Sequence, residues 1–245
     1  MRAGRLRRND GKVPGNSSEK RACVLTVNAP LAHRVVAIDG PAASGKSSVA
    51  RQLAQEIGFD YVNSGAMYRA ATWHALQRAI PPRDGDAIAR VLETSRIDCD
   101  LAGAAFRILI DGVDPAEHLH DDRVNDNVSL VSSVPRVREI LVARMRACAS
   151  DRDVVMEGRD IGSVVFPQTP YKFYIDASPE VRWRRRMAQG HRDQIAARDQ
   201  ADSSRQASPL IIAEDAHVID SSNLTIAEVV GEIVDRLKIK GMKIN

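Results

Sequence analysis

The sequence of 245 residues has few of the features that mark several common protein classes. It holds only three cysteines, Cys23, Cys99 and Cys148, with no CxxC motif. This argues against a disulfide framework and a zinc ribbon, and it favours a reducing compartment, the cytoplasm. No run of 18 apolar residues occurs, so we expect no transmembrane helix and no membrane partner. The remaining class is a soluble globular protein.

Positive charge is concentrated at one end of the chain. Residues 1–34 contain eight Lys or Arg and two acidic residues, whereas the other 211 residues contain 27 basic and 30 acidic groups. A general nucleic-acid surface would need the reverse distribution, with the basic excess on the body, so we expect no nucleic-acid partner. The extension over residues 1–33 has no apolar period and is expected to be disordered. Residues 34–245 are expected to form the folded domain.

Short apolar segments alternate with segments of helical period after residue 34. Strands are predicted at 35–38, 59–62, 154–156, 173–175 and 218–219, and helices at 47–57, 66–79 and 224–237. Strands separated by helices of this length pair in parallel, so the pattern predicts an α/β fold with three layers and a five-stranded parallel sheet.

Two segments interrupt this alternation. Residues 97–101 and 106–110 resemble the strands of a small antiparallel insert, which we place at about 92–128. Further helices are predicted at 124–131 and 137–147. Seven arginines fall between Arg182 and Arg205, a density that favours a short helical lid at about 182–207 that closes over phosphates.

The strongest motif is GPAASGKS at residues 40–47, which matches the phosphate-binding P-loop pattern GxxxxGK[ST]. An apolar strand precedes it and an amphipathic helix follows, as the P-loop fold requires. Backbone N–H groups and the helix N-terminus attract phosphate, Lys46 adds a cation, and the Ser47 hydroxyl is suited to Mg²⁺. The predicted ATP-binding residues are Gly40, Pro41, Ala42, Ala43, Ser44, Gly45, Lys46, Ser47 and Ser48.

A P-loop alone indicates only a nucleoside triphosphate. No NKxD motif is present, which disfavours a GTPase, and no predicted strand ends in the DE pair of a motor ATPase. Arg69, Arg138 and Arg159 follow predicted strands or begin helices, at the sheet edge where α/β proteins bind ligands. Because guanidinium groups form bidentate hydrogen bonds with phosphate, these residues indicate a second phosphorylated substrate.

Longer segments resemble the bacterial cytidylate kinases, within the nucleoside monophosphate kinase family. They are IDGPAASGKSS (38–48), NSGAMYR (63–69), SLVSSVPRVR (129–138), EGRDIGSVVFP (157–167), RDQADSSR (198–205) and SPL (208–210). The resemblance extends from residue 35 to about 238, and the strand-rich insert fits the monophosphate-binding region of that family. Asn63 and Glu157 stand where Asp is common, and Ser47-Ser48 replaces a Gly-Thr or Ser-Thr pair.

The resemblance implies a set of roles. Arg69, Arg159 and Arg205 would bind the acceptor phosphate, and Ser64 would line the acceptor site. Ser129, Arg138 and Asp160 would recognise cytosine, and Arg198 and Asp202 would contact the ribose. Lys46, Arg159 and Arg205 would be the catalytic residues, and Ser47 the metal ligand.

The function that follows is transfer of a phosphoryl group from ATP to CMP or dCMP, with Mg²⁺ as cofactor, by a monomeric enzyme. Two alternatives stay open at this stage. One is a P-loop kinase of another small molecule, such as UMP, AMP or shikimate. The other is a nucleotide-dependent protein that binds RNA through its basic extension.

Overall fold

The computed structural model describes residues 33–100, 106–188, 199–200, 204, 210–244. The basic extension and most of the expected lid therefore lie outside the described residues. Within the described part, no helix combines the length and the apolar character needed to cross a membrane.

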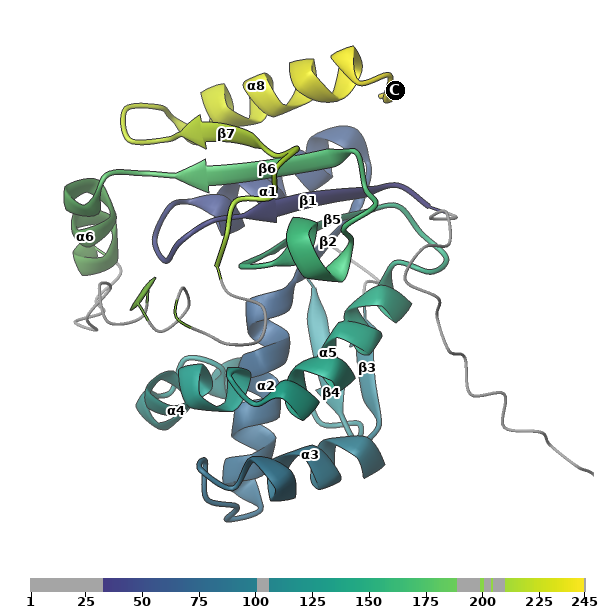
Figure 1. The fold of residues 1–245 in the computed structure, drawn as a ribbon, viewed down its shortest axis with the longest axis vertical. Helices are drawn as coiled ribbons and strands as arrows, with labels where there is room; N and C mark the ends of the chain where they lie inside the picture. Colours follow the sequence, from purple (N-terminus) through teal and green to yellow (C-terminus); the bar gives the residue numbers. More distant parts are fainter. Residues whose placement is uncertain (1–32, 101–105, 189–198, 201–203, 205–209, 245) are drawn as a thin grey trace, which may run out of the picture.

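The predicted three-layer α/β fold with a five-stranded parallel sheet is confirmed (Figure 1). The strand order is β2-β5-β1-β6-β7, and every pairing in this sheet is parallel. The strands are β1 (Val35–Asp39), β2 (Asp60–Asn63), β5 (Val154–Gly158), β6 (Tyr171–Asp176) and β7 (His217–Asp220). The P-loop strand β1 is therefore central, so the loop that follows it emerges in the middle of the sheet edge.

Each face of the sheet has its own core. Alternate residues of β1 point to opposite faces: Val36 and Ile38 belong to one buried cluster, and Val35 and Ala37 to the other. The helices over the first face are α1 (Lys46–Ile57) and α8 (Ile226–Ile239). A capping box between Thr225 and Glu228 begins α8.

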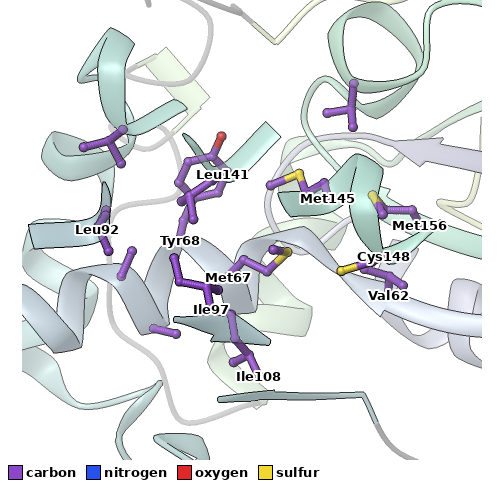
Figure 2. Close-up of a cluster of buried hydrophobic side chains, with 14 of the residues drawn as sticks. Val62, Met67, Tyr68, Leu92, Ile97, Ile108, Leu141, Met145, Cys148 and Met156 are labelled. Carbon is purple, nitrogen blue, oxygen red and sulfur yellow. The ribbon is translucent and has the colours of Figure 1, made fainter. Parts of the chain in front are cut away.

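The second buried cluster extends from the other face of the sheet into four helices. They are α2 (Ser64–Gln77), α3 (Gly85–Thr94), α4 (Asp122–Ser132) and α5 (Pro135–Cys148). Their apolar side chains meet those of the antiparallel hairpin β3 (Ile97–Asp100) and β4 (Arg107–Ile110) (Figure 2). The remaining described elements are the 3₁₀ turn η1 (Ala116–His118), the π-helical turn η2 (Ile161–Val165) and α6 (Pro179–Ala188).

One disulfide lies in this second layer. Cys99 of β3 is bonded to Cys148 of α5, with the Cα atoms 6.3 Å apart. The small number of cysteines predicts that the chain has no disulfide framework and lies in a reducing compartment. This single bond corrects the expectation that Cys99 and Cys148 are reduced. The two residues are 49 positions apart, so no local cysteine motif could indicate the pairing.

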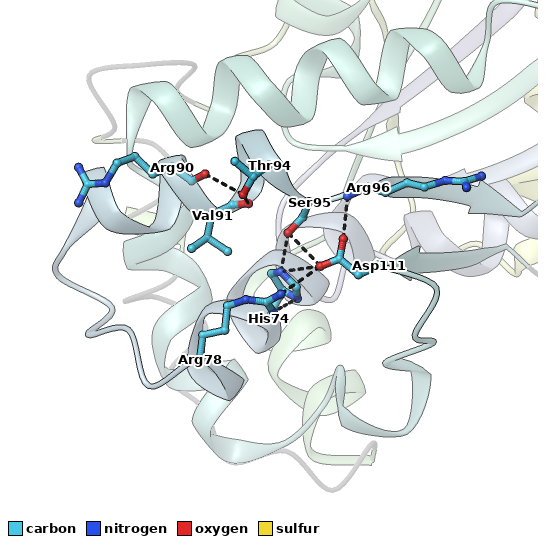
Figure 3. Close-up of polar contacts among 8 residues, drawn as sticks. All are labelled: His74, Arg78, Arg90, Val91, Thr94, Ser95, Arg96 and Asp111. Atoms are coloured by element: carbon cyan, nitrogen blue, oxygen red, sulfur yellow. Dashed lines mark hydrogen bonds and ion pairs between the residues drawn. The ribbon is translucent and has the colours of Figure 1, made fainter.

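A ring of hydrogen bonds joins the end of α2 to this hairpin (Figure 3). Nη1 of Arg78 lies 3.0 Å from Nδ1 of His74, and Nε2 of His74 lies 2.8 Å from the Ser95 hydroxyl. Ser95 and Arg78 both donate to Oδ2 of Asp111, at 3.2 and 3.1 Å. Because the Arg78 guanidinium can only donate, Nδ1 of His74 must accept its hydrogen bond. The proton of the imidazole ring therefore lies on Nε2. The ring therefore holds a neutral histidine.

Candidate active site

The P-loop connects β1 to α1 with the backbone shape that phosphate binding needs. At Gly40 a Cβ would lie 2.1 Å from the carbonyl oxygen of Ile175, so only glycine fits between the loop and β6. Gly45 has a φ of 93°, a conformation that glycine adopts without strain. The helix N-terminus that follows attracts an anion. Lys46 is buried, and its Nζ donates to the carbonyl oxygen of Pro41 at 3.1 Å.

A carboxylate from the neighbouring strand contacts the first turn of α1. Glu157 lies beside Ile38 in the β1–β5 register, and its side chain is buried. Its Oε1 accepts hydrogen bonds from the hydroxyls of Ser47, at 2.8 Å, and Tyr61, at 3.4 Å. A hydroxyl and a carboxylate oxygen are hard ligands of the kind that Mg²⁺ binds. The residues therefore fit a magnesium ion at this end of the P-loop.

The start of α2 faces the P-loop across the sheet edge. Asn63 caps this helix by accepting from the N–H of Ala66, and the hydroxyl of Ser64 donates to the carbonyl oxygen of Glu157 at 2.8 Å. One turn later, Nη1 of Arg69 donates to Oδ1 of Asn125 at 2.6 Å. The helix thus presents a guanidinium group that is held in place from α4.

Arg138 and Asp160 form a buried ion pair, and Asp160 follows β5, the strand next to β1. Their side chains are 4% and 5% exposed, and Nη2 of Arg138 donates to Oδ2 of Asp160. Nη1 of Arg138 also donates to the carbonyl oxygen of Ser132 at 3.1 Å, and the guanidinium carbon lies 5.2 Å from the centre of the Tyr68 ring. A planar cation, a carboxylate and an aromatic ring together suit a polar, planar ligand.

These groups line one cavity of about 450 Å³. The sequence-predicted residues on its wall are Ala42, Ala43, Gly45, Lys46, Ser47, Ser48, Ser64, Arg69, Ser129, Arg138, Arg159 and Asp160. Of the other predicted loop residues, Gly40 and Pro41 precede this wall, and Ser44 lines a neighbouring cavity. The predicted residues Arg198, Asp202 and Arg205 lie outside the described residues.

The neighbouring cavity, of about 360 Å³, lies on the other side of the P-loop. Its wall combines apolar side chains of α1 and α8 with Arg185 of α6. Arg185 donates to the carbonyl oxygens of Ser44, at 3.0 Å, and Ser221, at 2.7 Å. Sequence reasoning found the arginine-rich segment but did not place α6 against the P-loop.

Sequence reasoning also missed several residues of the main cavity wall or its support, Glu157 among them. Tyr68, Ser132 and His120 line the cavity, and Asn125 holds Arg69. Tyr68 lies within a recognised segment, NSGAMYR, which carried no role for it. Ser132 falls in another, SLVSSVPRVR, where the role was assigned to Ser129 and Arg138 instead.

Known proteins with similar sequences include cytidylate kinases of several bacteria. A family model for cytidylate kinase matches residues 36–239. A cytidylate kinase of Oceanobacillus iheyensis is 40% identical over 213 residues, which cover 82% of this chain and 93% of the relative. One from Desulforamulus reducens is 43% identical over 213 residues, covering 82% and 96%. Among solved structures, a Thermus thermophilus protein is 19% identical with a TM-score of 0.46, over 86% of this chain and 99% of its own.

Proposed function

The chain belongs to the cytidylate kinase family, and from this we propose how its residues divide the work of that activity. A cytidylate kinase transfers a phosphoryl group to CMP or dCMP, and the family implies ATP as the donor. The single cavity lined by both the P-loop and the Arg138–Asp160 pair carries the proposal. The P-loop wall of this cavity would bind the donor nucleotide, and the Arg138–Asp160 wall would bind the acceptor. The phosphoryl group would be transferred in the space between them.

We assign the donor to the P-loop. Backbone N–H groups and Lys46 hold the phosphates of ATP, and the loop's position at the centre of the sheet directs the γ-phosphoryl into the main cavity. The nucleoside of ATP is assigned to the neighbouring cavity, whose apolar wall and Arg185 suit a purine ring. The carbonyl contacts of Arg185 support this, because they fix its guanidinium beside the loop.

Ser47 and Glu157 are the residues that would hold magnesium. Their oxygens lie 2.8 Å apart at the P-loop, so both can serve one ion directly or through water. When bound, Mg²⁺ neutralises charge that develops between the β- and γ-phosphates. The sequence analysis named Ser47 alone, and the position of Glu157 adds a carboxylate to the proposed site.

The acceptor phosphate is assigned to Arg69 and Arg159. Both line the cavity near the P-loop, from α2 and from the segment after β5. An ionised phosphate oxygen of CMP attacks the γ-phosphorus, and the bond from that phosphorus to the bridging oxygen of ADP breaks. Because the attacking oxygen is already an anion, positioning and charge neutralisation supply the catalysis. Arg198, Asp202 and Arg205 keep their predicted ribose and phosphate roles as hypotheses.

Base recognition is assigned to Ser129, Arg138 and Asp160. The cytosine amino group would donate to Asp160, while O2 and N3 would accept from Arg138 and Ser129. Uracil places a carbonyl oxygen against the same carboxylate and leaves buried groups without hydrogen bonds, which costs binding energy. The burial of the Arg138–Asp160 pair supports this, since water cannot compensate for a mismatch there.

A substrate panel tests the proposed activity. The purified chain is given ATP and Mg²⁺ with CMP, dCMP, UMP, AMP or shikimate, and ADP formation is followed while products are identified by mass. CMP or dCMP should be phosphorylated with the highest kcat/KM. A preference for another acceptor by tenfold or more would contradict the base-recognition assignment. The monomeric state and the cytoplasmic location stay predictions.

A further inference from the structure

Asp39 is the last residue of β1, and its carboxylate binds a distant segment of the chain. Oδ1 accepts a hydrogen bond from the backbone N–H of Ile161, and Oδ2 accepts one from the N–H of Gly162, each at 2.8 Å. The side chain is buried, since the residue is only 5% exposed. Ile161 and Gly162 begin the turn η2, so Asp39 caps this turn from the neighbouring strand.

The residue that would ordinarily cap η2 is used differently. Asp160 occupies the N-cap position, but its side chain makes no capping hydrogen bond. Its carboxylate instead pairs with Arg138 on the cavity wall. Asp39 thus satisfies the first N–H groups of the turn in place of Asp160. The Asp160 carboxylate is thereby available to face a ligand.

The close contact depends on glycine at position 162. A Cβ at Gly162 would lie 3.4 Å from Oδ2 of Asp39 and 3.2 Å from two methylene carbons of Lys172. The distance to Lys172 is tight, whereas the distance to Asp39 is an ordinary van der Waals contact. Glycine at this position therefore lets the backbone of η2 lie close to both side chains.

Gly40, the residue after Asp39, contacts the residue on the other side of Asp160. The carbonyl oxygen of Gly40 accepts a hydrogen bond from Nη1 of Arg159 at 3.1 Å. Consecutive residues at the end of β1 therefore contact Arg159, Ile161 and Gly162. Asp160 lies between these contacts, so its position is fixed from both sides.

Burial makes ionisation of the Asp39 carboxyl group energetically unfavourable. Burial raises the pKa of Asp39 to about 7, the N–H groups of Gly162 and Ile161 act in the opposite direction, and the charge of Asp160 raises the pKa further. A strongly shifted carboxyl group beside a ligand cavity is more typical of a functional site than of a neutral structural contact.

We propose that Asp39 is a positioning residue for cytosine recognition, which holds the backbone around Asp160 so that its carboxylate meets the amino group of the base. This inference rests on the role proposed for Asp160. The role differs from that of the phosphate-binding residues in the adjacent loop, because a change at Asp39 should affect binding of the acceptor base.

A double-mutant cycle tests the inference. Asp39→Asn keeps the shape but turns an NH₂ group toward one of the two N–H donors. Asp160→Asn removes the negative charge proposed to receive the amino group of the base, and the third variant combines both changes. The affinities for CMP and UMP are measured by calorimetry without ATP, and kcat and KM are measured with ATP. Asp153→Asn is the matched control, because Asp153 also accepts a backbone N–H, that of Arg34, far from the cavity.

Asp39→Asn should weaken CMP binding about tenfold, as expected for a lost buried contact worth roughly 1.4 kcal/mol, and should lower the CMP-to-UMP affinity ratio. The double variant should bind CMP as Asp160→Asn does, since both act at one contact. Asp153→Asn should leave the ratio unchanged.

Two results would overturn the inference alone: an unchanged ratio in Asp39→Asn when Asp160→Asn lowers it, or additive effects in the double variant. An unchanged ratio in Asp160→Asn would overturn the base-recognition role and the inference with it. Should Asp39→Asn fail to fold, Gly162→Ala replaces it, because its Cβ would lie only 3.2 Å from the buried Lys172 side chain and would displace the N–H that Asp39 accepts. Gly162→Ala should lower the ratio, and an unchanged ratio would overturn the inference.

Discussion

The hydroxyl of Ser47 donates a hydrogen bond to Oε1 of Glu157 at 2.8 Å. This contact joins the first turn of α1, the helix that follows β1, to the carboxyl end of β5, the strand that pairs with β1. It places a buried negative charge beside the hydroxyl that the P-loop pattern assigns to magnesium. The metal requirement of the enzyme should therefore depend on both side chains.

Glu157→Gln should raise the Mg²⁺ concentration that gives half-maximal rate by about tenfold, because the amide keeps the hydrogen bond to Ser47 but loses the charge. The measurement is the rate as a function of Mg²⁺ at saturating ATP and CMP. Glu139→Gln, at an exposed position of α5, is the control and should behave as the unchanged chain. An unaltered Mg²⁺ dependence in Glu157→Gln would remove Glu157 from the metal site.

Lys46→Ala should lower kcat by about a hundredfold or more, since it removes a buried cation from the phosphates undergoing transfer. Lys238→Ala, at an exposed position of α8, should leave kcat unchanged. Steady-state rates at saturating ATP and CMP measure the effect. A kcat near that of the unchanged chain would contradict the donor assignment.

Arg138→Lys should lower kcat/KM for CMP by about tenfold while the protein stays folded. Lysine keeps a positive charge beside Asp160, which avoids the large penalty of an unpaired buried charge, but it lacks the planar pair of donors. The loss should appear in KM more than in kcat, because the base does not react. An equal loss in kcat, with KM unchanged, would show that Arg138 acts on the transferring phosphoryl group.

Acid should weaken the fold through His74. Burial lowers the pKa of His74, and the nearby Arg78 lowers it further, with Asp111 acting in the opposite direction. A histidine whose folded pKa is depressed stabilises the fold above its unfolded pKa of about 6.5, and that stability is lost as the pH falls toward the folded pKa. The slope for one such group is at most about 1.4 kcal/mol per pH unit.

Urea unfolding at pH 7.5 and pH 5.5 measures this dependence. His74→Gln, which cannot take up the proton, should lose less stability between the two pH values than the unchanged chain does. His118→Gln, at a half-exposed position, should keep the original dependence. Equal losses in the unchanged chain and His74→Gln would exclude His74 as the cause.

Removal of residues 1–33 should leave kcat and the melting temperature unchanged, because the folded part is anchored at the next residue. The backbone N–H of Arg34 donates to Oδ1 of Asp153 at 2.6 Å, and its guanidinium group donates to Oδ2 of the same residue. A folded but inactive truncated chain would show that the extension takes part in catalysis.

The strong periodic signals made much of the fold predictable. The five strands, the P-loop helix and the antiparallel hairpin all lie within a few residues of the predicted positions, because each has a clear apolar pattern. The helix α3 had no prediction, although its buried residues Ile88, Ala89 and Leu92 lie on one face at helical spacing.

The site was predictable where one loop carries the chemistry and unpredictable where distant segments meet. The P-loop and the arginines near strand ends were found from residue type and position. The turn η2 has five residues and is capped by Asp39, which is more than a hundred positions away, so no local pattern could indicate it. The pairing of Cys99 with Cys148 and the support of Arg69 by Asn125 are long-range contacts of the same kind.

The most direct test of how two nucleotides share this site is a crystal structure of the chain with CMP and a non-hydrolysable ATP analogue. The cytosine should lie against the Arg138–Asp160 pair, with its amino group on the Asp160 carboxylate and the CMP phosphate bound by Arg69 and Arg159. A cytosine bound elsewhere, or bound with its amino group away from Asp160, would contradict the proposed division of the cavity.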